Sequence, residues 1–141
     1  LPWRLLAGYS LDEAAFAALK QRAPAGVIVE RARPDFIDLL KYCVLSISQG
    51  GYNTVMEVLA TGARGIAVPY AGGQETEQTL RARLLEERGL IHQIPGGELT
   101  KDRLIEKISL AMDGAAPAGP GNIDMDGAWK TADLLARRLG T

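Results

Sequence analysis

The sequence predicts an α/β fold built on a parallel sheet, and three observations support this prediction. Short apolar runs alternate with amphipathic stretches along the 141 residues. Three of the apolar runs are continuously aliphatic, as in strands that are covered on both faces. The connections between the runs are short, which is typical of β–α units joined by right-handed crossovers.

The apolar runs place the strands, and the order of strands and helices predicts the topology. We expect strands at residues 3–7, 27–30, 44–48, 65–69 and 90–94. Because helical stretches separate the strands, neighbouring strands are expected to run parallel, with helices packed on the sheet. The sequence therefore predicts a doubly wound, Rossmann-like parallel sheet.

The helical stretches carry start and stop signals. We expect helices at residues 11–22, 36–42, 53–61, 75–88 and 101–112. Ser10 and Glu13 form a capping-box pattern at the first of them. Gly62 and Gly89 lie just past the ends of two others, where glycine is favoured. Thr100 is suited to cap the last one, because its hydroxyl can accept a hydrogen bond from a free helix amide.

The composition changes towards the C-terminus. Residues 114–122, GAAPAGPGN, form a flexible linker rich in alanine, glycine and proline. We therefore expect one α/β domain at residues 1–113, the linker at 114–122 and a C-terminal segment at 123–141 with a helix at 127–139. The sequence leaves open whether this helix packs on the same domain or on another one.

Composition and charge exclude several classes of protein. A formal net charge of −1 argues against broad electrostatic binding to nucleic acid or to an anionic membrane. No apolar run approaches the roughly 20 residues that span a bilayer. The single cysteine, Cys43, excludes an internal disulfide framework and fits a reducing compartment. The chain starts at Leu1 without a signal-peptide pattern, so we expect it to be part of a longer polypeptide.

The stretch VLSISQGGYNTVME, residues 44–57, combines a strand, a glycine pair and a helix start. Ligands of open parallel sheets bind beyond the carboxyl ends of the strands. Gly50 and Gly51 remove side chains at the turn, so a phosphate could approach the backbone amides closely. The helix N-terminus adds unpaired N–H groups and partial positive charge, and Asn53 and Thr54 can add side-chain donors. This combination suits a diphosphate.

Glu57 lies one helical turn beyond the glycine pair. Asn53 and Glu57 are four residues apart and share a helix face. A carboxylate there can accept hydrogen bonds from both hydroxyls of a ribose, whereas next to the phosphates it would be repelled. Taken alone, a glycine pair is more often only a tight turn, with Glu57 as a solvated helix residue.

A second polar loop, PYAGGQETEQ at residues 69–78, follows the next strand. It is rich in side chains that can hydrogen-bond vicinal sugar hydroxyls, namely Gln74, Glu75, Glu77 and Gln78. Acceptor carboxylates in such a loop discriminate between hydroxyl patterns. Taken alone, these residue types at a helix start more often cap and solvate the helix.

Together, the two loops resemble the donor site of nucleotide-sugar glycosyltransferases with the GT-B architecture of two facing Rossmann-like domains. QGGYNTVME, residues 49–57, resembles their signature, which reads HCGWNSTLE in plant UDP-glycosyltransferases. RPDFIDLL, SISQGGYNTVMEVLATGARGIAVP and EQTLRA are most similar to the family 28 C-terminal domain. Within that family they resemble a bacterial group related to the peptidoglycan N-acetylglucosaminyltransferase. The resemblance covers about residues 27–110.

The resemblance implies a role for each site residue. The implied diphosphate contacts are Gln49, Gly50, Gly51, Asn53 and Thr54. Glu57 would hold the ribose, and the loop around Arg33 would contact the nucleobase edge through its backbone. Glu77 and Gln78 would face the donor sugar, with Gln74 competing for the contact of Gln78 because this loop is one residue longer than in the peptidoglycan enzyme. Gln49 stands where the plant enzymes have a phosphate-binding histidine.

The implied function is transfer of a hexosyl group from a nucleoside-diphosphate sugar, with UDP-sugar favoured, to an acceptor hydroxyl. We expect no catalytic residue in this chain, because the general base would come from the N-terminal acceptor-binding domain of the same polypeptide. The only histidine, His92, lies in an apolar strand and is expected to be structural. No Asp-rich cluster is present, and we expect neither a metal nor another cofactor. The resemblance implies a cytoplasmic enzyme whose acceptor-binding domain could approach the inner membrane.

Two other functions are alternatives to sugar transfer. A UDP-sugar 2-epimerase has a similar stretch, Ser-Gly-Gly-x-Gln-Glu-Glu, but Gly-Gly-Tyr-Asn-Thr at residues 50–54 favours transfer. A non-catalytic nucleotide-binding module is the second alternative.

The first β–α unit of a GT-B donor-binding domain, with its glycine-rich loop, is expected to be missing from this chain. Its absence would leave a bare strand edge prone to self-association. We also expect no transferase activity from this chain alone.

Overall fold

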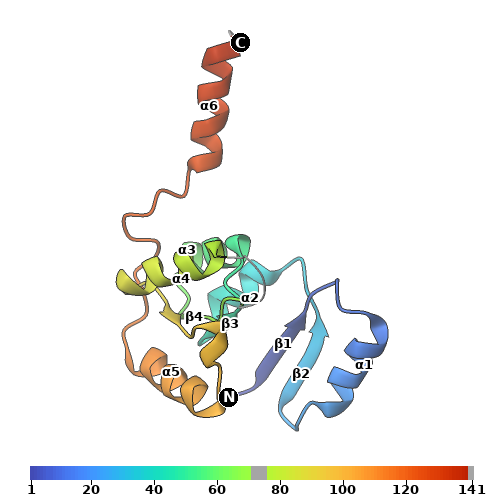
Figure 1. Cartoon of the computed structure of the whole chain (residues 1–141). Helices are drawn as coiled ribbons and strands as arrows, with labels where there is room; N and C mark the ends of the chain where they lie inside the picture. Colours follow the sequence, from blue (N-terminus) through green and yellow to red (C-terminus); the bar gives the residue numbers. More distant parts are fainter. Residues whose placement is uncertain (71–75, 140–141) are drawn as a thin grey trace. The chain divides into compact units, whose positions relative to one another are not determined.

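The computed structural model describes residues 1–70 and 76–139 of the chain (Figure 1). The protein consists of two compact units, Leu1–Asp38 and Leu39–Thr141, each with its own parallel sheet. The predicted parallel α/β fold is therefore confirmed. The described strands differ from the prediction in forming two sheets, since pairing joins β1 to β2 and, separately, β3 to β4 and β4 to β5.

The first unit contains a single β–α–β arrangement. Strand β1 (Trp3–Ala7) pairs in parallel with β2 (Val27–Arg31), so that Trp3 lies opposite Val27. Helix α1 (Glu13–Arg22) connects the two strands. Its N-cap is Asp12, whose carboxylate accepts a hydrogen bond from the Ala15 amide at 2.8 Å.

The predicted capping box of Ser10 with Glu13 is wrong. Asp12 takes the capping position, because the helix begins two residues later than the prediction and a carboxylate there also favours the positive end of the helix dipole. The Glu13 side chain instead accepts a hydrogen bond from Arg31 at 2.8 Å.

The second unit is built on a three-stranded parallel sheet in the order β3–β4–β5. Its strands are short, with bounds Ser46–Ser48, Gly65–Ala67 and His92–Gln93. Ser46 lies opposite Gly65, and Ile66 lies opposite His92. Helices in this part of the chain are α2 (Phe36–Tyr42), which crosses the unit boundary, α3 (Tyr52–Thr61), α4 (Glu77–Glu87), α5 (Lys101–Asp113) and α6 (Gly127–Leu139). A short 3₁₀ helix, Gly96–Glu98, precedes α5.

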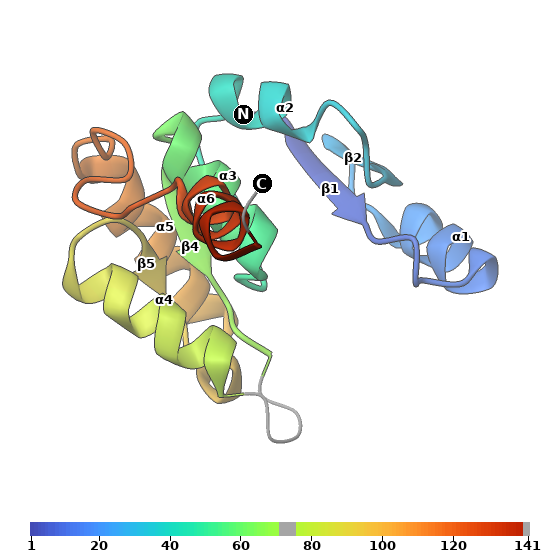
Figure 2. The same cartoon turned by 90° about the horizontal axis from the view of Figure 1, so that it is seen from above.

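The two faces of this sheet differ in the size of their side chains. Ile66 and Ile94 are almost fully buried and pack with Ile47, Val68 and side chains of α5. The opposite face, under α3, is lined by small residues of β3 and β4, namely Ser46, Ser48, Gly65 and Ala67. Figure 2 shows α3, α4 and α5 around this sheet. Helices thus cover both faces, as the doubly wound prediction requires.

Gly65 explains how closely α3 approaches the sheet. A Cβ atom at this position would lie 3.0 Å from Val58 of α3 and 3.1 Å from Ile91. Val55, Val58 and Leu59 form the buried face of α3, as predicted from their spacing. The close packing holds the helix against this face of the sheet.

The predicted helix ends at Gly62, Gly89 and Thr100 are confirmed. Gly62 and Gly89 both have a φ of +68°, the left-handed conformation that closes a helix C-terminus. The Thr100 hydroxyl accepts a hydrogen bond from the Arg103 amide at 3.2 Å and caps α5. The helix predicted at 127–139 has these same bounds in the structure.

The segment after α5 contacts earlier parts of the second unit. Arg64 donates a hydrogen bond to the carbonyl oxygen of Gly114 at 3.0 Å. The carbonyl oxygen of Pro117 lies 3.2 Å from the position of a Cβ atom built on Gly62. In the part of the chain that the structure describes, none of the helices is long and apolar enough to cross a membrane.

Candidate functional site

Gly50 forms the bend between β3 and α3. Its φ is +74°, a conformation that is strained for residues with a side chain. Gly50 is also buried, and a Cβ atom there would lie 3.2 Å from the Cβ atom of Ala67 on β4. Its amide donates a hydrogen bond to the Ser48 hydroxyl at 3.2 Å. The bend therefore requires glycine for two reasons: the positive φ, and the nearby Ala67 side chain, which leaves little room for a Cβ atom.

Gly51 is the N-cap of α3 and leaves the helix tip open. Among the described residues, a Cβ atom built on Gly51 meets nothing within 4 Å, so none of them fills the space in front of the tip. The amide of Val55 donates to the carbonyl of Gly51 at 3.0 Å, which is the first bond of the helix. The amides before Val55 have no helical carbonyl to bind, and they carry the positive end of the dipole. Because Gly51 offers no side-chain cap, these donors are available to an anion.

The other predicted residues of this loop lie around the tip. Gln49 and Asn53 are exposed, while Thr54 and Glu57 are half-buried. Glu57 follows Asn53 by one turn of the same helix, and its backbone carbonyl accepts a hydrogen bond from the Thr61 hydroxyl at 2.8 Å. The α3 tip thus brings together backbone donors and, one turn further, a carboxylate.

Arg81 connects α4 to this tip. Its Nη1 atom donates a hydrogen bond to the carbonyl oxygen of Gly50 at 3.4 Å, and its guanidinium lies 5.2 Å from the centre of the Tyr52 ring. Arg81 also forms an ion pair with Glu77, one turn earlier on α4. The side chain of Arg81 is only 16% exposed, although it carries a charge.

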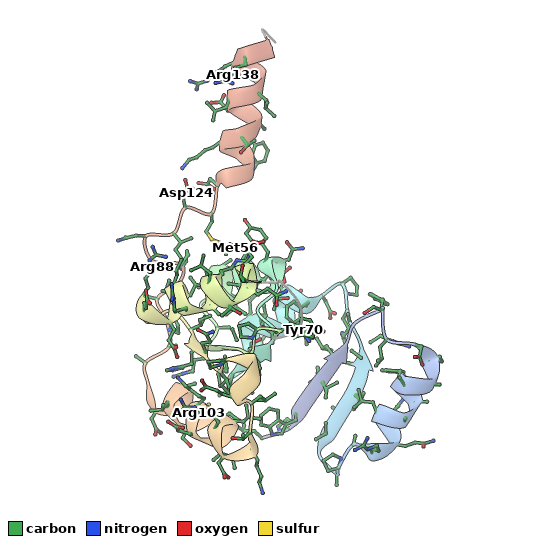
Figure 3. The ribbon with its side chains drawn as sticks, viewed as in Figure 1. Met56, Tyr70, Arg88, Arg103, Asp124 and Arg138 are labelled. Carbon is green, nitrogen blue, oxygen red and sulfur yellow. The ribbon has the colours of Figure 1, made fainter. Side chains whose placement is uncertain are left out.

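The residues predicted to face the sugar lie at the start of α4. Glu77 is exposed apart from its ion pair with Arg81, and Gln78 is half-buried. The Gln78 side-chain oxygen accepts a hydrogen bond from the amide of Tyr70 at 3.4 Å, which ties α4 to the chain after β4. Tyr70 is labelled in Figure 3. Gln74 and Glu75 lie outside the described residues. Of the predicted sugar contacts, the structure therefore describes Glu77 and Gln78 alone.

Arg33, the residue of the predicted base-contacting loop, belongs to the first unit. Its guanidinium forms two hydrogen bonds with the carboxylate of Asp35, at 2.8 and 2.7 Å, and one with Glu30 at 3.4 Å. The hydrogen bonds from Arg33 lower the pKa of Asp35, and Asp35 in turn raises the pKa of Arg33. These contacts occupy the side chain and hold the loop after β2 in shape.

Neither histidine nor metal-ligand geometry marks a second centre in the described residues. His92 lies in β5, half-buried, opposite Ile66. Within residues 1–70 and 76–139, no group of three or more His, Cys, Asp or Glu side chains is arranged to hold a metal ion.

Sequence reasoning missed Arg81 and Tyr52 as members of this site. The spacing of Glu77 and Arg81 does indicate an ion pair on one helix face. It does not indicate that the guanidinium reaches Gly50, because that contact joins residues 31 positions apart. The EQTLRA stretch therefore indicates the ion pair of Glu77 with Arg81, but not the contact of Arg81 with Gly50.

The chain is similar to known proteins over most of its length. Residues 32–118 match the model of the glycosyltransferase family 28 C-terminal domain. The chain is 33% identical over 109 residues to a UDP-N-acetylglucosamine--N-acetylmuramyl-(pentapeptide) pyrophosphoryl-undecaprenol N-acetylglucosamine transferase from Rhodospirillum centenum, covering 75% of this chain and 28% of that protein. It is 35% identical over 102 residues to the Bradyrhizobium diazoefficiens enzyme of the same name, covering 68% and 28%. The chain thus spans less than a third of these relatives.

Solved structures show the same fold. The glycotransferase of kitacinnamycin matches with a TM-score of 0.69 at 23% identity, over 98% of this chain and 35% of that one. MurG from Acinetobacter baumannii matches with a TM-score of 0.65 at 21% identity, over 97% and 42%. At such low identity the likeness concerns the fold alone.

Proposed function

Since this chain belongs to the glycosyltransferase family 28 C-terminal domain family, we propose that it binds the nucleotide part of a sugar donor. The whole protein then transfers a hexosyl group from a nucleoside-diphosphate sugar to an acceptor hydroxyl. A UDP-sugar is the proposed donor, because the relatives from Rhodospirillum centenum and Bradyrhizobium diazoefficiens are named for UDP-N-acetylglucosamine. The family match favours transfer over the 2-epimerase alternative.

The open tip of α3 is the observation that carries this proposal. Gly50 turns the chain at a φ of +74°, and Gly51 leaves the first helix amides without a side-chain cap. Backbone donors and a helix dipole converge there, which is the arrangement that binds a diphosphate. Gln49, Asn53 and Thr54 surround the tip and complete the proposed diphosphate contacts.

The same donors support a chemical role in the transfer step. When the bond between the sugar and the diphosphate breaks, negative charge develops on the leaving diphosphate. N–H groups that are already aimed at this position stabilise the charge without having to reorient. We assign the general base to the acceptor-binding domain of the same polypeptide, so we expect this chain alone to bind the donor without transferring the sugar.

Glu57 is the proposed ribose ligand, and α4 faces the sugar. The Glu57 carboxylate lies one turn beyond the diphosphate position, where two vicinal hydroxyls can both donate to it. Glu77 and Gln78, together with Gln74, are the proposed contacts of the donor sugar. The loop around Arg33 is proposed to meet the nucleobase edge through its backbone.

Titration calorimetry with UDP tests this function. We expect the chain to bind UDP and Glu57→Gln to weaken binding about tenfold, because a hydrogen bond to a charged group is worth about 1.5–3 kcal/mol. 2′,3′-Dideoxyuridine diphosphate is the matched ligand, since it lacks the two ribose hydroxyls. Wild type and Glu57→Gln should bind this analogue equally. Equal weakening for both ligands would contradict the ribose role, and absence of UDP binding by the wild type would contradict the proposed function.

A further inference from the structure

We propose that Arg81 is a positioning residue of the diphosphate site, which acts by holding the Gly50–Gly51 peptide in one orientation. This inference rests on the proposed function, because it assigns Arg81 a part in donor binding. Arg81 lies on α4, outside the loop that is expected to contact the diphosphate. Its three contacts all converge on the start of α3 and of α4.

The Gly50–Gly51 peptide needs such a hold. Both residues lack a side chain, and glycine adopts a wide range of backbone angles. A Cβ atom built on Gly51 would meet nothing within 4 Å in residues 1–70 and 76–139, so these surroundings do not restrain Gly51. Rotation of this one peptide would turn the Gly51 amide away from the ligand position while leaving α3 intact.

The hydrogen bond from Arg81 fixes the direction of that amide. The peptide bond is planar and trans, so the carbonyl of Gly50 and the N–H of Gly51 point in opposite directions. The guanidinium binds the Gly50 carbonyl at 3.4 Å, which directs the Gly51 N–H away from α4. Contact with the Tyr52 ring at 5.2 Å gives the guanidinium a second hold at the start of α3.

The charges around Arg81 indicate that this arrangement suits an anion. A cation next to a helix N-terminus is electrostatically unfavourable, because the helix end is itself partly positive. Glu77 compensates part of this repulsion through its ion pair with Arg81. A bound diphosphate would supply further negative charge at the same place, so Arg81 favours the occupied state of the site.

Calorimetry with two ligands separates positioning from a general structural effect. Uridine contains the base and ribose of UDP but no phosphate. We expect Arg81→Gln to weaken UDP binding about tenfold and to leave uridine binding unchanged, because only the diphosphate uses the oriented amide. Arg83→Gln is the matched control, since Arg83 lies on the same helix and pairs with exposed Glu87 at 3.7 Å. This control should bind both ligands as the wild type does.

A second variant keeps the test decisive if Arg81→Gln folds poorly. Arg81→Lys retains the charge and one donor for the Gly50 carbonyl, so we expect it to bind UDP within about threefold of the wild type. UDP binding by Arg81→Gln at wild-type strength, or an equal loss for UDP and uridine, would overturn the positioning role alone. Arg81→Lys with UDP binding as weak as that of uridine would also overturn it. If the wild type binds neither ligand, the donor-binding function itself is contradicted, and the positioning role with it.

Discussion

Gly50 shows at the scale of one residue how the turn of this site is specified. Its left-handed backbone excludes most side chains, and Ala67 closes the space that a Cβ atom would need. Gly51, the next residue, has neither restriction. Glycine at residue 50 is therefore needed for the structure of the turn. Glycine at residue 51 instead leaves the tip of α3 accessible to a ligand.

This difference leads to a prediction on stability. Gly50→Ala should lower the free energy of unfolding by about 1–3 kcal/mol, because it combines backbone strain with a contact of 3.2 Å. Urea denaturation followed by circular dichroism measures the change. Gly51→Ser is the control and should leave stability unchanged or slightly higher, since serine is a favoured N-cap. If Gly51→Ser lowered the free energy of unfolding as much as Gly50→Ala, any substitution in the turn would be destabilising, and the conformation of Gly50 would not be the reason.

Arg81 marks the limit of what single residues reveal in the sequence. The glycine pair, Asn53 and Glu57 could be selected from local spacing, because a turn and a helix face depend on neighbours in the chain. The contact of Arg81 with Gly50 depends on how α4 packs relative to the turn between β3 and α3, which no local pattern encodes. The roles of these site residues in donor binding are predictions, which the calorimetry described above tests.

At the scale of elements, the prediction was closest for β1, α2 and α6 and least close for the strands of the second unit. The bounds of α2 and α6 agree with the prediction, whereas the strand expected at 65–69 is reduced to Gly65–Ala67. Val68 and Pro69 are still half-buried and buried, respectively. An apolar run thus indicates burial, and only hydrogen bonding to a neighbour decides where a strand ends. Pairing partners are also non-local, which is why the division into two sheets was not predicted.

Glu86 joins three elements of the second unit. Its carboxylate accepts hydrogen bonds from the Lys107 ammonium of α5 at 2.7 Å and from the Gln93 amide of β5 at 2.9 Å. Burial opposes ionisation of Glu86, but the hydrogen bonds from Lys107 and Gln93 outweigh burial and lower its pKa. A carboxylate with a lowered pKa in the folded state stabilises the fold above its unfolded pKa, and this contribution is lost as the pH falls through the folded value.

We therefore expect a pH-dependent effect of Glu86→Gln. At pH 7 the variant should lose about 1–2 kcal/mol of unfolding free energy, because a charge-assisted hydrogen bond is replaced by a weaker one. The difference from wild type should shrink as the pH falls through the lowered pKa of Glu86, because the carboxylate then becomes protonated. Urea denaturation between pH 3 and pH 7 measures it. Glu87→Gln, at an exposed neighbouring position, is the control and should show little change at either pH.

At the scale of the whole molecule, the family match and the site fall in the same part of the chain. The match covers residues 32–118, which includes α3, α4 and the sheet of the second unit. Helix α6 follows the matched segment and exposes Trp129, Leu134 and Leu135. Exposed apolar side chains on a helix are typical of a surface that another part of a protein covers.

The proposed site also predicts how binding responds to metal removal. UDP affinity should be the same in EDTA as in millimolar Mg²⁺, because backbone amides and the dipole of α3 provide the compensating positive charge. Calorimetry in the two buffers measures this. A large loss in EDTA that Mg²⁺ restores would show that the diphosphate is bound through a metal ion instead.

The tight fit of α3 on its sheet has a consequence for the thermodynamics of association. Leu59 is only 1% exposed, and left-handed glycines lie at both ends, at Gly50 and at Gly62. A tip supported in this way is already ordered before a ligand arrives, so little conformational entropy has to be lost on binding. The heat-capacity change should accordingly be small, because a helix that is already folded buries no further apolar surface of its own.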